Sequence, residues 1–125
     1  CVTGGVFSEG IDLKNESLIG ALIVGTGIPQ ICTERRLLKE YYEERDGNGY
    51  DYAYTYPGMN KVLQAAGRVI RTMEDKGVIM LLDDRFSREA YVRLFPEEWA
   101  DYKLVNISQA ADVVSDFWSG INAGR

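Results

Sequence analysis

The sequence of 125 residues contains no histidine and only two cysteines, Cys1 and Cys32, which are far apart and form no CxxC pair. This usage indicates neither a metal site nor a disulfide framework, and it favours a reducing compartment, the cytoplasm. No apolar run approaches the length of a membrane span, and no signal peptide is recognisable, so we expect no membrane association. The net charge of −5 argues against gripping nucleic acid by bulk positive charge. Any such contact would be local or shared with a more basic partner.

Composition is otherwise ordinary, with 46% hydrophobic and 26% charged residues, and the length suits one globular domain. No internal repeat or low-complexity segment is present. The sequence has no initiating methionine and begins inside an apparent strand. We therefore expect it to be a fragment of a larger protein.

Alternating strands and helices predict an α/β fold with a mostly parallel sheet and right-handed crossovers. Two near-continuous apolar runs are typical of strands buried on both faces of a parallel sheet, LIGALIV at residues 18–24 and VIMLL at residues 78–82. Shorter strands are predicted at residues 1–3 and 102–107. The sheet is expected to lack strands that the full protein supplies before Cys1.

Helices are predicted between these strands. One covers residues 34–44, with Thr33 as its cap and an apolar stripe that contains Leu37, Leu38, Tyr41 and Tyr42. A short helix is expected at residues 87–94, and a last helix begins after Ser108 as its cap and frays at Gly120. The tyrosines at positions 50, 52, 54 and 56 alternate with other residues, which predicts a half-buried extended segment. Packing against the neighbouring helix explains this row best, and base stacking is the alternative.

Three segments carry polar or glycine-rich patterns that suit ligand binding. Residues 4–13 contain three glycines after a strand, where α/β proteins place ligands. The GTG of residues 25–27 lacks the spacing of a phosphate loop and is predicted to be a turn. The strand ending at Asp83 resembles a magnesium-binding acidic element, but the sequence has no P-loop. We therefore expect Asp83 to orient a nearby arginine or to cap the next segment.

The helix predicted to start at Pro57 and to reach Arg71 organises the chain. At about 100° per residue its polar face carries Gln64, Gly67, Arg68 and Arg71, and its opposite face is apolar. Two guanidiniums on one face suit phosphate, and we expect them to point out of the ligand edge of the sheet. The alternative is an ordinary surface helix whose arginines pair with Glu74 or Asp75.

Two of these segments together resemble a known family. GVFSEGIDL at residues 5–13 resembles motif V of the XPD/DinG branch of superfamily 2 helicases, and QAAGRVIR at residues 64–71 resembles their motif VI. DKGVIMLLDDRF at residues 75–86 matches the continuation of that pattern. The resemblance implies a three-layer RecA-like domain, truncated at its N-terminal side. Residues 1–125 would then be the C-terminal portion of the second RecA-like motor domain of a bacterial DinG-type helicase.

The resemblance also implies roles for individual residues. Arg71 matches the arginine finger, Arg68 its companion at the γ-phosphate, and Gln64 the glutamine that senses nucleotide or attacking water. Further implied contacts with ATP involve Gly67 and the motif V residues Gly10 and Asp12. Contacts with a DNA phosphate are implied for Thr3 or Ser8. Independently of the resemblance, the charged face of the first helix is usually just solvated, but Arg35 and Arg36 could touch a nucleic-acid backbone if they lie near the ligand edge of the sheet.

The implied cofactors are ATP and Mg²⁺, bound mainly by a first RecA-like domain of the same polypeptide. The implied nucleic acid is single-stranded or forked DNA. Cys1 and Cys32 match no ligand of the family's iron–sulfur cluster, which leaves a cluster in the parent protein undecided. The P-loop is absent from these residues, so we expect the isolated fragment neither to hydrolyse ATP nor to unwind DNA. The alternative is a non-catalytic α/β module that binds a phosphorylated ligand or a protein.

Overall fold

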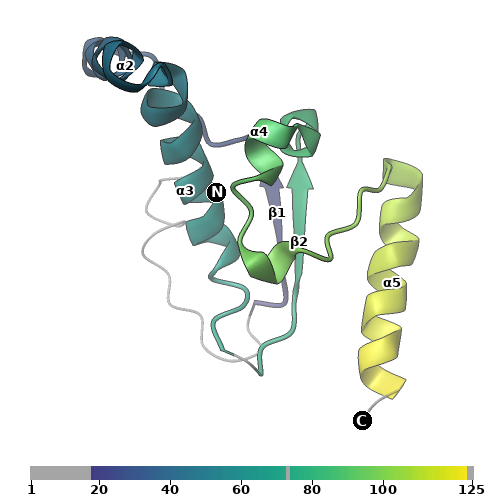
Figure 1. The fold of residues 1–125 in the computed structure, drawn as a ribbon. Helices are drawn as coiled ribbons and strands as arrows, with labels where there is room; N and C mark the ends of the chain where they lie inside the picture. The colour runs from purple at the N-terminus through teal and green to yellow at the C-terminus, as the bar shows by residue number, and fades with distance from the viewer. Residues whose placement is uncertain (1–17, 73, 124–125) are drawn as a thin grey trace. The chain divides into compact units, whose positions relative to one another are not determined.

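The computed structural model describes residues 18–72 and 74–123, which form two compact units, Cys1–Leu94 and Phe95–Arg125 (Figure 1). The units are described separately below. Five sequence predictions lie outside the described residues. These are the strand at residues 1–3 and the roles of Thr3, Ser8, Gly10 and Asp12.

The first unit contains a parallel pair of strands, as predicted. β1 (Gly20–Val24) pairs with β2 (Val78–Leu82), and the register places Gly20 beside Val78 and Val24 beside Leu82. Within the described residues these two strands make up the sheet. The connection between them passes through α2 (Thr33–Asp46) and α3 (Tyr56–Ala66), which gives the α/β class predicted from the sequence.

One face of the sheet is covered and the other is exposed. Ile23 is only 6% exposed, whereas its neighbours Leu22 and Val24 are 68% and 76% exposed. Because side chains alternate along a strand, this pattern means that α3 covers one face of β1. The prediction that this strand is buried on both faces is therefore wrong for the described part of the chain. The buried hydrophobic residues that form the core of the described part of this unit are Ile23, Ala53, Tyr54, Met59, Val62, Ala66, Val69, Phe86 and Tyr91.

The helix α2 begins one residue earlier than predicted and carries an exposed stripe. Cys32 occupies the N-cap position, so Thr33 is the first helical residue rather than the cap. Gly47 ends the helix in the left-handed conformation, with φ of 66°. The stripe expected to be its core face is largely exposed, since Leu37 is 60% and Tyr41 is 57% exposed. Tyr42 is the member of the stripe that is packed, because it stacks on Tyr52 of the next helical run.

The tyrosine row is helical, so the predicted extended segment is wrong. Residues 49–66 form one helical run, in which Asp51–Thr55 is a π-helix and α3 follows directly. Within it Tyr50 contacts Tyr54 and Tyr52 contacts Tyr56, with ring centroids 5.1 and 5.2 Å apart. A period of two residues also contains a period of four, which a helix satisfies equally well. Pro57 is the second residue of α3, near its start as predicted, but the helical run as a whole begins earlier, at residue 49.

After β2 the chain forms two short helical segments. A 3₁₀ helix spans Asp84–Ser87 and α4 spans Glu89–Val92, which matches part of the helix predicted at residues 87–94. Phe86 and Tyr91 are buried and meet edge to face, with centroids 6.1 Å apart. They anchor this end of the first unit.

The second unit contains a 3₁₀ turn and one long helix. The ring of Phe95 packs against Trp99 and Tyr102 at centroid distances of 5.3 and 5.4 Å. Residues 102–106 are exposed and form no strand, so that prediction is wrong. The helix α5 spans Ile107–Ala123, continuing through Gly120.

The cap of α5 also differs from the prediction. The Asn106 side-chain oxygen accepts the backbone N–H of Gln109 at 3.1 Å, so Asn106 is the cap in place of Ser108. Among the helices within residues 18–72 and 74–123, none has the length and apolar character needed to cross a bilayer.

Candidate functional site

The predicted site residues lie at the end of α3 and in the connection to β2. α3 ends at Ala66, and Arg68 N–H and Val69 N–H then donate to carbonyls three residues back, at 3.3 and 3.0 Å. Such bonds tighten the last turn of a helix and close it. The prediction of one continuous helix to Arg71 is therefore wrong, and Arg71 does not share a helical arc with Gln64.

The arginines of this segment remain at the surface. Gln64, Gly67 and Arg71 are exposed and Arg68 is half-buried. Val69, only 4% exposed, sits between the two arginines in sequence and anchors the turn in the core. Neither guanidinium is folded into the interior.

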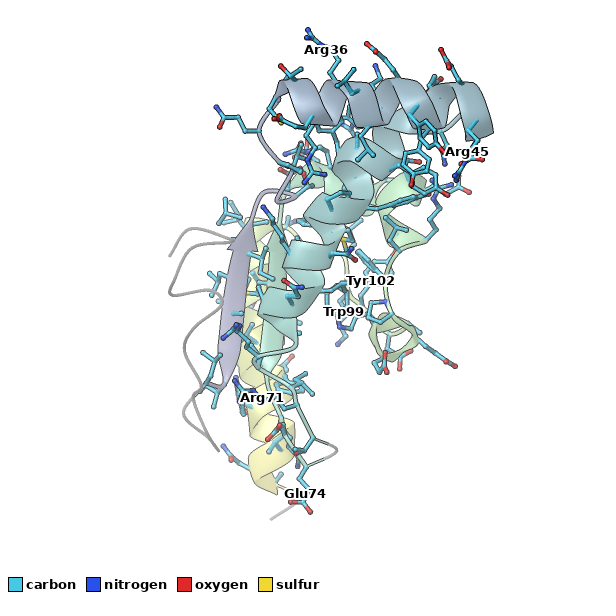
Figure 2. The ribbon with its side chains drawn as sticks, turned by 90° about the vertical axis from the view of Figure 1, so that its left-hand side faces the viewer. Arg36, Arg45, Arg71, Glu74, Trp99 and Tyr102 are labelled. Atoms are coloured by element: carbon cyan, nitrogen blue, oxygen red, sulfur yellow. The ribbon has the colours of Figure 1, made fainter. Side chains whose placement is uncertain are left out.

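The segment lies at the opposite edge of the sheet from the one expected. Parallel strands need a connection that returns the chain to its starting edge, so residues between α3 and Val78 lie where the strands begin. Figure 1 shows α3 running opposite to both strands, and Figure 2 shows Arg71 at the end where they start. The expectation that Arg68 and Arg71 lie at the carboxyl ends of the strands is thus wrong.

Asp75 holds the connection in shape. Its Oδ2 accepts the backbone N–H groups of Arg71 and Thr72, both at 2.8 Å. The turn is also closed by Asp75 N–H donating to the Thr72 carbonyl at 3.3 Å. The Arg71 and Thr72 N–H groups lower the pKa of Asp75 from its ordinary value of 3.8, in that order of importance. The alternative predicted pairing therefore occurs with the Arg71 backbone, while its guanidinium contributes through charge.

A glycine fixes the other end of this connection. A Cβ added to Gly77 would overlap Cγ1 of Val69 and lie 3.1 Å from the Ile19 carbonyl oxygen. Next to it, Val78 N–H donates to the same carbonyl at 3.0 Å. Sequence reasoning named neither Asp75 nor Gly77 as a site residue, although the D-x-G spacing of the motif was the signal that could have found them.

Arg35 and Arg36 are not brought to this segment. Their helix, α2, lies at the other end of α3 in both views (Figures 1 and 2). Arg36 is exposed and points away from the sheet. Arg35 is half-buried, and its Nη1 donates to the Ala53 carbonyl at 3.2 Å.

The tyrosine rings pack on one another, which favours the packing interpretation over base stacking. Tyr42 of α2 stacks on Tyr52, with centroids 4.2 Å apart and planes 9° apart. The Arg45 guanidinium lies 4.7 Å from the centroid of the same Tyr42 ring. Tyr52 in turn meets the edge of Tyr56. These rings join α2 to the following helical run.

The carboxyl edge of the sheet has its own two turns. Asp83 Oδ1 accepts the Arg85 backbone N–H and Nε at 2.9 and 2.8 Å, and Oδ2 accepts Nη2 at 2.7 Å. Both predicted roles of Asp83, orienting an arginine and capping the next segment, are confirmed. The described part of the chain contains no group of three or more His, Cys, Asp or Glu side chains placed to hold a metal ion.

The GTG segment is a turn, as predicted, and it packs closely on α3. Gly25 and Gly27 have φ of 82° and 63°. A Cβ on Gly58 would lie 2.6 Å from the Thr26 carbonyl oxygen, so the turn and the helix are in direct backbone contact there.

A family model described as the helicase C-terminal domain matches residues 1–102. The chain belongs to this helicase C-terminal domain family. Its C-terminal helicase region is of the XPD/DinG branch, as the motifs predicted, and its α/β structure with a parallel sheet fits a RecA-like fold.

Three relatives illustrate the similarity. This helicase C-terminal domain is 34% identical over 90 residues to the general transcription and DNA repair factor IIH helicase subunit XPD of Dictyostelium discoideum, covering 70% of the chain and 11% of the relative. It is 31% identical over 103 residues to the ATP-dependent DNA helicase DinG of Photobacterium profundum, covering 81% and 15%. It is 33% identical over 107 residues to a regulator of telomere elongation helicase 1 homolog of Caenorhabditis elegans, covering 77% and 10%.

The match thus spans less than a fifth of each of these relatives. They come from a bacterium and from eukaryotes, so the bacterial DinG type stays a prediction.

Proposed function

We propose that this chain supplies the arginine-bearing side of the ATP site in an ATP-dependent DNA helicase. Arg71 acts as the arginine finger and Arg68 as its companion, while Gln64 orients the attacking water or senses the nucleotide. The observation that carries the proposal is the segment after α3, where Asp75 fixes the backbone at Arg71 and Thr72 and leaves Arg71 at the surface. The family membership and the names of the relatives support the reaction class.

For this side of the ATP site, the reaction requires mainly a positive charge placed at the γ-phosphate. Phosphoryl transfer spreads negative charge over the γ-phosphate, and a guanidinium delivered from another domain can accelerate it by roughly 10³–10⁵. Arg71 and Arg68 supply that charge when the first RecA-like domain, which binds ATP and Mg²⁺ through its own residues, closes against this edge. Gly67, exposed at the end of α3, leaves room for that approach. Delivery from a second domain couples hydrolysis to closure, as a translocating motor requires.

The nucleic-acid side of the proposal rests on the family resemblance. We assign single-stranded or forked DNA as the partner and the motif V residues Gly10 and Asp12 as the link between nucleotide and strand. Thr3 or Ser8 and the exposed Arg36 are the proposed backbone contacts. An iron–sulfur cluster is not assigned, and the predicted cytoplasmic location is retained as part of the proposal.

The test compares the full-length protein with its Arg71→Ala variant. We expect the variant to lose DNA-stimulated ATP hydrolysis by about 10³-fold or more while its affinity for ATP changes by less than about fivefold. The matched control is Arg45→Ala, an exposed arginine of α2 with no proposed role at ATP or DNA, which should keep hydrolysis within about threefold.

The isolated chain supplies a second arm. It should neither hydrolyse ATP nor bind it at micromolar concentration. Tight nucleotide binding by the isolated chain would favour the phosphate-binding module instead, and unchanged hydrolysis in the Arg71→Ala protein would refute the finger assignment.

A further inference from the structure

Pro57 interrupts a helix from within. It lies in the helical run of residues 49–66, where a proline lacks the N–H that would bond to the carbonyl four residues back. That carbonyl belongs to Ala53, and the proline ring would also collide with it in a regular α-helix. The π-helical turn of Asp51–Thr55 ends two residues before Pro57 and widens the helix at this point. Pro57 therefore explains both the irregular turn and a carbonyl left without its α-helical partner.

Arg35 supplies a replacement donor from a different helix. Its Nη1 donates to the Ala53 carbonyl at 3.2 Å, and Ala53 is 0% exposed. A buried carbonyl without a donor is costly, whereas a bond from a guanidinium is charge-assisted. The same helix α2 also provides an acceptor, because Glu43 Oε2 accepts the Gly49 N–H at 2.8 Å at the beginning of the run.

We propose that Arg35 is a positioning residue that replaces the hydrogen bond removed by Pro57 and so fixes the π turn ahead of the helix that carries Gln64 and Gly67. Its guanidinium serves the protein backbone rather than nucleic acid. This differs from the role that the sequence suggested for Arg35.

The π turn is important because it determines which face of α3 packs against the sheet. In the turn, Tyr56 N–H donates to the Asp51 carbonyl, five residues back. One extra residue in a helical turn rotates the following helix by about 100°. With this rotation Met59, Val62 and Ala66 face the core and Gln64 faces solvent. Loss of the π turn would turn a different face of α3 to the sheet.

The contacts on the early part of the run hold it independently of α3. Tyr52 stacks on Tyr42 of α2, and Asp51 accepts from Arg93 at 2.9 Å. Both contacts hold the first two residues of the π turn, and Arg35 acts on its third residue, Ala53. The consequence for catalysis rests on the proposed function; the pairing of Arg35 with Pro57 does not.

A double-mutant cycle of Arg35→Gln and Pro57→Ala in the full-length protein tests the pairing. Alanine restores an N–H at position 57 that can bond to the Ala53 carbonyl. We expect Arg35→Gln alone to raise hydrogen exchange at the Tyr56 and Gly58 amides by about tenfold and to lower Tm. In the Pro57→Ala background the same change should have less than about a third of that effect. Equal effects in both backgrounds would overturn the proposal.

Two further variants keep the test decisive. Arg35→Lys retains a donor and should raise exchange less than Arg35→Gln. If Arg35→Gln alone does not fold, its recovery by Pro57→Ala is the expected result, and failure of the double variant to fold while Pro57→Ala folds counts against the pairing.

The DNA arm separates this role from a phosphate contact. We expect Arg35→Gln to change the affinity for single-stranded DNA by less than about twofold, with the same salt dependence as the unchanged protein. If Arg35→Gln reduces the slope of log K for DNA binding against log salt concentration by about one, while amide exchange is unchanged, Arg35 is a DNA contact and the proposal is overturned. If the unchanged protein proves inactive as an ATPase, the proposed function fails, but the exchange cycle still decides the role of Arg35.

Discussion

The two ends of β2 carry two aspartate turns that use their carboxylates differently. At the carboxyl end, Asp83 binds Arg85 through both oxygens and through the backbone N–H. At the amino end, Asp75 Oδ2 accepts the backbone N–H groups of Arg71 and Thr72. The first arrangement occupies a guanidinium with a structural partner. The second fixes the main chain at Arg71, whose side chain is exposed.

This difference bears on the two arginines. Arg85 is held in a bidentate pair, which is geometrically specific. Arg71 is attached to a backbone that its aspartate has already ordered, so less freedom remains to be lost when the side chain meets a ligand. We infer that the carboxyl-end turn orders an arginine side chain, whereas the amino-end turn orders the backbone that carries one.

The largest expected effect separates these two arginines. In the full-length protein, Arg71→Ala should lower kcat for ATP hydrolysis by about 10³-fold, because transition-state charge is lost. Arg85→Ala should leave kcat within about threefold while lowering Tm, because its partner Asp83 is left unpaired. Steady-state kinetics and thermal unfolding of both variants measure the contrast. Similar losses of kcat in the two variants would remove the distinction drawn here.

The next effect concerns Asp75. Asp75→Ala should release the turn and lower kcat by about ten- to a hundredfold, since small misplacements of a catalytic group have effects of that size. Asp75→Asn keeps a side-chain oxygen that can accept both N–H groups, so we expect a smaller loss. ATP affinity measured beside kcat distinguishes the two variants. An Asp75→Ala protein with unchanged kcat would show that Arg71 needs no ordered backbone.

Glycine contacts at the two ends of α3 give the third prediction. A Cβ at position 58 would strike the Thr26 carbonyl, a backbone atom, so Gly58→Ala should cost about 1–3 kcal/mol. At position 77 the main obstacle is the Val69 side chain, which can shift, so Gly77→Ala should cost less.

The control for this pair is Gly120→Ala in α5, where no atom lies within 4 Å of the added Cβ. That change should stabilise the helix by about 0.5–1 kcal/mol. Denaturant unfolding reports all three, and equal costs at positions 58 and 77 would contradict the ranking.

The smallest effect is a dependence on pH. The Arg85 guanidinium lowers the pKa of Asp83 from 3.8 to about 2 in the folded protein. Because the pKa of this carboxyl is lower in the folded than in the unfolded protein, its ionisation stabilises the fold at pH values above about 4. That stabilisation is lost as the pH falls from about 4 towards 2. We expect a contribution of about 1 kcal/mol, because solvent screens the partly exposed pair. When the free energy of unfolding is measured at several pH values, its decrease between about pH 4 and 2 should be smaller for Asp83→Asn. An equal decrease in both proteins would show that the Asp83–Arg85 pair is not the source of the pH dependence.

The fold was predictable from the sequence where the pattern of apolar residues fitted only one kind of secondary structure. VIMLL at residues 78–82 became β2 with the predicted bounds, and Asp83 took both of its predicted roles. The tyrosine row failed because a spacing of two residues fits a strand and also fits paired contacts four residues apart on a helix. The strand predicted at residues 102–107 failed because a strand needs a partner that those residues lack in the described structure.

The site was predictable in its residues but not in its geometry. Gln64, Gly67, Arg68 and Arg71 share a helical face only if the helix continues, but it ends at Ala66 with Gly67 as its C-cap, a stop signal to which the prediction gave too little weight. Similarly, the role of Arg35 follows from a carbonyl 18 residues away. Such a contact can be identified only once the packing of α2 against the following helical run is known.

The close backbone contact between Gly58 and the Thr26 carbonyl has a mechanical consequence. Beyond its last residue, the turn after α3 brings Val69 against Gly77 beside the Ile19 carbonyl. Both the start of α3 and the turn that follows it are therefore in close contact with the segments that flank the strands. We expect α3 and the two strands to move together when the segment that carries Arg68 and Arg71 is displaced.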